Sequence, residues 1–218
     1  MNDTELKIKL MEPAMRARQY SKDNTNGNRS SHRTDLLNGT LVNNFLKDIF
    51  PEEKGFQIRC EERVDDSRGS NFKIDIVIYK GVEYVTLLHL KSVERSLNKN
   101  RNNYAHTVYG ENQRVFGRIE ENETGVCPLR RKCLSLHLEW MPNFVECGDR
   151  MEKTNPVKID SAHLEYCAKG LYPEAKAAHK KISFDIVDDS LFGYDNVSLD
   201  VCREIYNELT RQRDRFES

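Results

Sequence analysis

The stretch from Phe72 to Lys91 constrains the fold of this 218-residue chain more than any other. It contains two runs of apolar and β-branched residues, 72–79 and 84–91, on either side of Lys80-Gly81. Strand-length runs of this composition, separated by a short glycine-containing turn, predict a β-hairpin. The chain is therefore expected to contain a β-sheet built outward from this hairpin.

One end of the predicted hairpin gathers polar side chains. Side chains two apart on a strand share a face, so His89 and Lys91 point one way and Leu90 points the other way. Antiparallel pairing of the two strands would bring Asp75 beside His89. The sequence thus predicts that a carboxylate, an imidazole and an ammonium group converge at the end of an apolar sheet.

This order of residues resembles the core of the PD-(D/E)xK nucleases, the superfamily that includes most type II restriction endonucleases. In that family one strand carries an Asp, and the next strand carries an acid, one spacer residue and a Lys. The matching residues here are Asp75, His89 and Lys91, with Ile74 where the family often has Pro. His89 departs from the pattern, because Glu or Asp is usual at its position.

The predicted elements around the hairpin follow the order found in that core. Apolar periodicity predicts helices over 4–20, 35–50, 107–121 and 197–216, and composition adds a short charged helix over 174–181. Strands are predicted over 55–64, 134–140, 158–164 and 182–187, and polar loops over 20–33 and 92–106. The resemblance implies an α/β fold in which helices flank a central mixed β-sheet, with a restriction-endonuclease-like core over about 35–140.

Length and composition favour a single domain over residues 1–218. No apolar run approaches the roughly 18 residues of a membrane helix, and the N-terminus lacks the apolar segment of a signal peptide. The six scattered cysteines are expected to be reduced thiols in a cytoplasmic protein.

The resemblance also implies a role for the residues after 140. They would supply DNA contacts and the interface of a two-fold homodimer, the assembly suited to cutting both strands of a palindrome.

The resemblance assigns roles to the polar residues of the hairpin. Asp75 and the Leu90 carbonyl would hold a divalent metal, and Lys91 would position the attacking water or stabilise the charge on the phosphate. A carboxylate suits Mg²⁺, whereas a histidine ligand would favour Mn²⁺. His89 could thus be a metal ligand, a residue that contacts the true ligand without binding the metal, or a sign that the site has lost its catalytic activity. Glu62 could supply the missing carboxylate, and weaker candidates are Asp65, Asp66 and Glu111.

Candidate DNA contacts follow the predicted lysine strand, where six Lys or Arg oppose two acids between Lys91 and Arg118. Asn and Arg side chains can bond adenine and guanine bidentately, and Lys and Arg can contact phosphates. The candidates here are Arg95, Asn98, Lys99, Asn100, Arg101, Asn102, Asn103 and Arg114. Arg29 and Arg33, in the predicted loop over 20–33, are further candidates for phosphate contacts.

The function implied by the resemblance is sequence-specific cleavage of double-stranded DNA with a divalent metal. Three alternatives remain open: a related nuclease acting on RNA or non-duplex DNA, a nuclease-like DNA-binding protein without activity, and an α/β protein unrelated to nucleic acid. A zinc site is a further possibility, with Cys127, Cys133, His137 and Cys147 as ligands. Their spacing is not that of a common zinc module, which favours buried thiols instead.

Overall fold

The computed structural model describes residues 1–24, 31–65, 71–93, 97–116, 128–147, 149–155, 158–188, 190 and 192–217. Within these ranges, six strands form one sheet in the order β1-β2-β3-β4-β7-β8. They are β1 (Phe56–Asp65), β2 (Asn71–Lys80), β3 (Glu83–Ser92), β4 (Leu134–Pro142), β7 (Lys176–Ile186) and β8 (Tyr194–Asp195). A separate hairpin pairs β5 (Phe144–Cys147) with β6 (Arg150–Lys153).

The sheet is mixed, and its parallel part lies at the centre. β1, β2 and β3 form an antiparallel meander, β4 and β7 join β3 in parallel, and β8 is antiparallel to β7. All of β4 is buried, as expected for a central parallel strand that is covered on both faces. Parallel strands need crossover connections, which are usually helices. These helices supply the residues that lie above the faces of the sheet.

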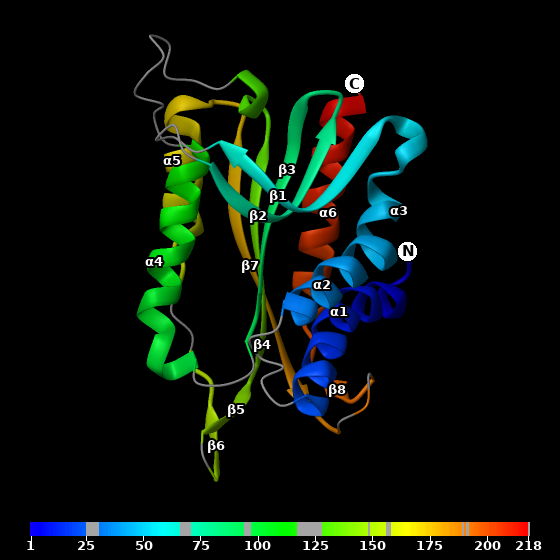
Figure 1. Ribbon diagram of the computed structural model, residues 1–218, viewed down its shortest axis with the longest axis vertical. Coiled ribbons are helices and arrows are strands. Elements are labelled where there is room, and N and C mark those ends of the chain that lie inside the picture. The colour runs from blue at the N-terminus through cyan, green and yellow to red at the C-terminus, as the bar shows by residue number, and fades with distance from the viewer. Residues whose placement is uncertain are drawn as a thin grey trace.

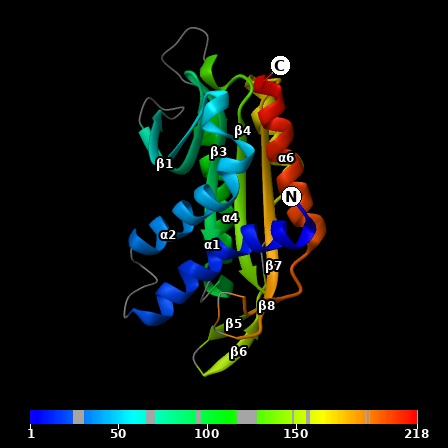
Figure 2. The same ribbon diagram turned by 90° about the vertical axis from the view of Figure 1, so that its right-hand side faces the viewer.

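Helices cover both faces of the sheet (Figures 1 and 2). One face carries α1 (Asp3–Asp23), α6 (Leu199–Glu217) and a helical run made of α2 (Ser31–Leu41), the π-helical turn η2 (Val42–Leu46) and α3 (Lys47–Ile49). The other face carries α4 (Leu97–Phe116) and α5 (Ser161–Leu171). Two short 3₁₀ turns complete the described helices, η3 (Glu52–Lys54) and η4 (Pro128–Arg130).

Two apolar clusters hold these layers together. The larger one lies between the sheet and α1, α2 and α6, and the smaller one lies between the sheet and α4 and α5. Buried polar side chains join the layers at specific points: the Trp140 indole donates to the Leu10 carbonyl at 2.6 Å, and Gln212 donates to the Val85 carbonyl at 2.7 Å. Such buried hydrogen bonds fix the register between helices and sheet.

The hairpin expected from the sequence is confirmed. β2 and β3 pair antiparallel with Ile76 opposite Leu88, and Gly81 in the connecting turn has φ = 61°, a conformation that favours glycine. The α/β class and the mixed sheet flanked by helices are also confirmed. No helix among the described residues could span a membrane.

Four expected elements differ in the structure. Residues 97–106, expected as a loop, form the first half of α4. The expected strand over 158–164 is instead the start of α5, where the Asp160 side chain accepts from the backbone amides of Ala162 and His163. The expected helix over 174–181 belongs largely to β7. Of the loop expected over 20–33, the two ends are helical and residues 25–30 lie outside the described chain.

Candidate metal centre

The parallel strands place three histidines side by side. His89 on β3 lies opposite His137 on β4, which in turn lies opposite His179 on β7. Tyr104 of α4 contacts His179, and Glu111 of the same helix contacts the other two histidines, so this row points toward α4. Tyr104 and Glu111 are seven residues apart, about two helical turns, and therefore share one face of α4.

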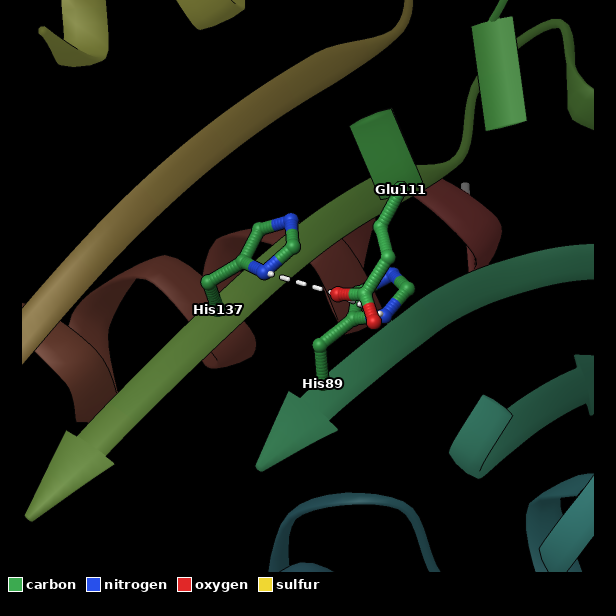
Figure 3. A group of neighbouring side chains, drawn as sticks. All are labelled: His89, Glu111 and His137. Atoms are coloured by element: carbon green, nitrogen blue, oxygen red, sulfur yellow. Dashed lines mark ion pairs between the residues drawn. The ribbon is translucent and has the colours of Figure 1, made fainter. Parts of the chain in front are cut away.

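Glu111, His89 and His137 form a compact group of possible metal ligands (Figure 3). One Glu111 carboxylate oxygen, Oε2, lies 3.2 Å from His89 Nδ1 and 3.7 Å from His137 Nδ1. The two imidazoles are stacked, with ring centroids 4.3 Å apart and ring planes inclined by 10°. Each residue offers one ligand atom, and these atoms all lie within 4.8 Å of one another.

Two of the three donor–donor distances in this group are close to those around a bound transition-metal ion. Two donor atoms bound to one ion at about 2.1 Å lie about 3.0–3.4 Å apart in octahedral or tetrahedral geometry. The His89–Glu111 distance falls in this range, and the His137–Glu111 distance exceeds it by a few tenths of an ångström. Two imidazoles with one carboxylate are donors that suit Mn²⁺, Zn²⁺ or Fe²⁺ better than Mg²⁺.

The histidines also have unused bonding capacity. The Nε2 atoms of both His89 and His137 are buried and, among the described residues, have no hydrogen-bond partner. Burial holds the pKa of His137 well below its usual value, and the neighbouring His89 and His179 lower this pKa further. His137 is therefore neutral at physiological pH, which is the form of imidazole that binds a metal.

Asp75 of β2 lies next to this group. Its Oδ2 accepts a hydrogen bond from the Leu90 backbone amide at 2.7 Å. Burial raises the pKa of the Asp75 carboxyl, and the negative charges of Glu111 and Glu61 raise it further, whereas the Leu90 amide and His89 lower it. Several carboxylates thus share a partly buried region, a charge distribution that a bound cation would stabilise.

A second polar group continues the row toward β7. His179 Nε2 lies 3.2 Å from Glu139 Oε2 and 3.2 Å from the Tyr104 hydroxyl. Glu139 is only 1% exposed, and its Oε1 has no hydrogen-bond partner among the described residues. Burial raises the pKa of Tyr104, with further contributions from Glu139 and Glu111, so the phenol stays protonated and can donate a hydrogen bond.

The structure brings some of the expected site residues together and separates others. Asp75 lies beside His89 as expected, but it contacts the Leu90 backbone amide, whereas the expected role was for the Leu90 carbonyl. Lys91 is exposed at the end of the same strand. Glu62, expected as the additional carboxylate, instead pairs with Arg59 at 3.4 Å. The acid of β1 that acts on Asp75 is Glu61, which has φ = 54° and pairs with Lys73 at 2.7 Å.

The expected DNA-contact residues lie in several environments. Asn103 is exposed on α4. Arg114 stacks over the Phe72 ring at 4.3 Å, and Arg33 donates to the Ser92 carbonyl at 3.0 Å. For Asn98, Lys99, Asn100, Arg101 and Asn102 the structure describes only a helical backbone, while Arg29 and Arg95 lie outside the described residues, as do Asp66 and Cys127. Of the other residues considered for zinc, Cys133 packs in the α4–α5 core and His137 belongs to the group around Glu111.

Several site residues were missed or ranked low on sequence alone. Glu111 was a weaker candidate, His137 was considered only for zinc, and Tyr104, Glu139 and His179 were not identified. A signal for the strand residues does exist: the motifs His-Leu-Lys, His-Leu-Glu and His-Lys-Lys begin at residues 89, 137 and 179. If the three strands had been known to be neighbours, this shared His-x-charged pattern would have predicted a row of histidines beside a row of charged residues on one face of the sheet.

Comparison with known proteins adds no relative: no family model, curated protein or solved structure matches this chain.

Proposed function

We propose that this protein is a metal-dependent nuclease that hydrolyses phosphodiester bonds in double-stranded DNA. The convergence of Asp75, His89, Glu111 and His137 beside Lys91 carries this proposal. The strand order around these residues, an Asp strand followed by an antiparallel strand ending in His-x-Lys, is the order of the PD-(D/E)xK core. Glu111 would take the place of the acid that His89 replaces.

The residues of the candidate site would have different roles in this reaction. Asp75, His89, Glu111 and His137 would hold a divalent metal, which when bound polarises a phosphate and lowers the pKa of an attacking water. The Leu90 amide keeps the Asp75 carboxylate oriented through its 2.7 Å hydrogen bond. The exposed Lys91 ammonium would meet the negative charge of the scissile phosphate. Cutting both strands of a palindromic site would call for a two-fold homodimer.

The test is cleavage of a long defined DNA with Mg²⁺ and, separately, with Mn²⁺. Discrete fragments are expected, with Mn²⁺ more effective than Mg²⁺ because of the imidazole ligands. Glu111→Gln should reduce the rate by at least about a hundredfold, since it removes a ligand charge from the centre. Glu62→Gln is the matched control and should leave cleavage nearly unchanged, because Glu62 pairs with Arg59.

The other outcomes separate the alternatives. DNA binding without cleavage in any metal would favour a lapsed site, and preferential cleavage of RNA would favour a related nuclease. If Glu62→Gln abolished cleavage and Glu111→Gln did not, Glu111 would not be a ligand. Absence of both binding and cleavage would refute a function on DNA.

A further inference from the structure

A row of charged residues lies next to the histidine row on the same face of the sheet. Lys91 on β3 is opposite Glu139 on β4, and Glu139 is opposite Lys181 on β7. Each follows a histidine by two positions and therefore shares its face, about 6.6 Å further along the strand. Two lysines thus lie beside the candidate metal centre, on either side of the buried Glu139.

Neither lysine has a partner among the residues that the structure describes. Glu139 directs its Oε2 to His179 at 3.2 Å, and within the described part of the chain Lys91 and Lys181 make no ion pair or hydrogen bond. Lys91 is exposed, and Lys181 is half-buried. An ammonium group that leaves water must find a counter-charge, so a half-buried unpaired lysine is suited to binding an external anion.

The other lysines of β7 differ in this respect. Lys176 pairs with Glu208 at 3.2 Å, and Lys180 pairs with Glu204 at 2.6 Å, both on α6 at the opposite face of the sheet. β7 therefore pairs its lysines on the α6 face, whereas Lys181, on the face of the candidate metal centre, has no partner in the described ranges. Lys180 and Lys181 are adjacent in sequence and carry the same charge, which makes Lys180 a natural internal control.

We propose that Lys181, together with Lys91, binds the backbone phosphates of the DNA substrate next to the metal centre. β3 and β7 are two strand spacings apart, about 10 Å, and lysine side chains from both can reach the same phosphate or neighbouring phosphates of one strand. Such contacts set the position of the backbone and carry no base information. This inference rests on the proposed function, because it assumes that DNA is the substrate of the adjacent centre.

The test measures binding of a fluorescent DNA duplex in EDTA, so that cleavage does not interfere, over a series of salt concentrations. Each phosphate contact contributes about 0.9 to the slope of log K against log salt concentration. Lys181→Ala should reduce this slope by about one and weaken binding equally for unrelated sequences. Lys180→Ala should leave the slope unchanged, and Lys181→Arg should restore most of the affinity lost in Lys181→Ala. Thermal unfolding of each variant verifies that the fold is intact.

The outcomes distinguish this inference from the proposed function. If Lys181→Ala leaves the slope unchanged, or changes it no more than Lys180→Ala does, Lys181 does not contact phosphate, whether or not the enzyme cleaves DNA. If Lys181→Ala reduces the slope but the wild-type protein cleaves no DNA with any metal, the phosphate contact is supported and the nuclease function is refuted. If the wild-type protein binds no DNA in EDTA, the phosphate contact is refuted, and if it also cleaves no DNA with any metal, both proposals are wrong.

Discussion

At the scale of single residues, Asp75 combines burial with proximity to other carboxylates, and both raise its pKa above the ordinary value of 3.8. The folded state then binds its proton more tightly than the unfolded state. The free energy of unfolding consequently falls as pH rises between the unfolded and folded pKa values of Asp75, and at neutral pH the whole of this cost in stability is present. A bound divalent cation would offset this cost.

Asp75→Asn removes the charge but retains an oxygen that can accept from the Leu90 amide. We expect the metal-free variant to be more stable than the wild type at pH 8 and nearly equal to it in acid, and to bind Mn²⁺ more than about tenfold more weakly. Urea unfolding in EDTA at pH 3 and pH 8, with calorimetric Mn²⁺ titration, measures both effects. A metal-free variant less stable than the wild type at pH 8 would contradict this account of Asp75.

For His137 we expect stability to depend on pH in the opposite direction. Its folded pKa lies well below 6.5, so the unfolded state binds more protons below that pH. The neutral His137 therefore lowers stability only below about pH 6.5. As pH falls from there toward the folded pKa, the free energy of unfolding of the metal-free protein decreases by at most about 1.4 kcal/mol per pH unit. His137→Asn should flatten this slope in urea unfolding between pH 5 and pH 8, whereas His106→Asn, at an exposed position on α4, should not.

At the scale of elements, α4 determines whether the candidate site is complete, because it supplies Glu111 and Tyr104 while the other site residues come from the sheet. Near the C-terminal end of α4, Arg130 is 1% exposed and donates to the Val115 carbonyl at 2.8 Å and to the Asp65 carbonyl of β1. The guanidinium thus connects the end of this helix to the sheet, with its charge near the negative end of the helix dipole.

Arg130→Met should therefore lower the free energy of unfolding by about 2–3 kcal/mol, because charged hydrogen bonds to two carbonyls are lost. The amides of α4 should exchange with deuterium faster, and Mn²⁺ affinity should fall because Glu111 is held less firmly. Arg131→Met is the matched control: its side chain is 69% exposed and, among the described residues, pairs with Glu174 alone, so a change within about 0.5 kcal/mol is expected. Equal effects of the two substitutions would argue against an anchoring role for Arg130.

β7 illustrates why some elements could not be predicted from local sequence. Residues 174–181 are rich in Ala, Lys and Glu, which have high helix propensity. In the structure Lys176 to Lys181 of this segment pair in parallel with Leu134 to Glu139 of β4, which are six of the nine residue pairs between β4 and β7. Hydrogen bonding to a central strand outweighs the weak intrinsic preference for a helix.

The first half of α4 is a second example. Its polar residues, 97–106, are expected from the sequence to form a loop, but packing of the later, apolar turns of α4 against the sheet stabilises the whole helix.

At the scale of the whole molecule, a bound metal would connect β2, β3, α4 and β4, four elements that lie between residues 71 and 142. An ion that binds only the folded state stabilises it by about 2.7 kcal/mol at a concentration of 100 times Kd. For a chain of this length, that corresponds to a rise in Tm of roughly 5–10 °C. We expect Mn²⁺ to produce this shift and Glu111→Gln to abolish it, while Glu62→Gln retains it. A thermal melt with and without Mn²⁺ provides the measurement, and equal shifts in all three proteins would indicate binding elsewhere.

The sequence by itself determined the β2–β3 hairpin, the helices at both ends of the chain and the place of Asp75 beside His89, because these features depend on local periodicity, turn residues and short-range pairing. Only the tertiary structure decided that His137 and His179 continue the row of His89, that Glu111 reaches this row, and that Lys181 lies in line with Lys91. Those relations depend on strand order and on the path of a helix crossing above the sheet. Both are set by packing between distant segments, which no local pattern encodes.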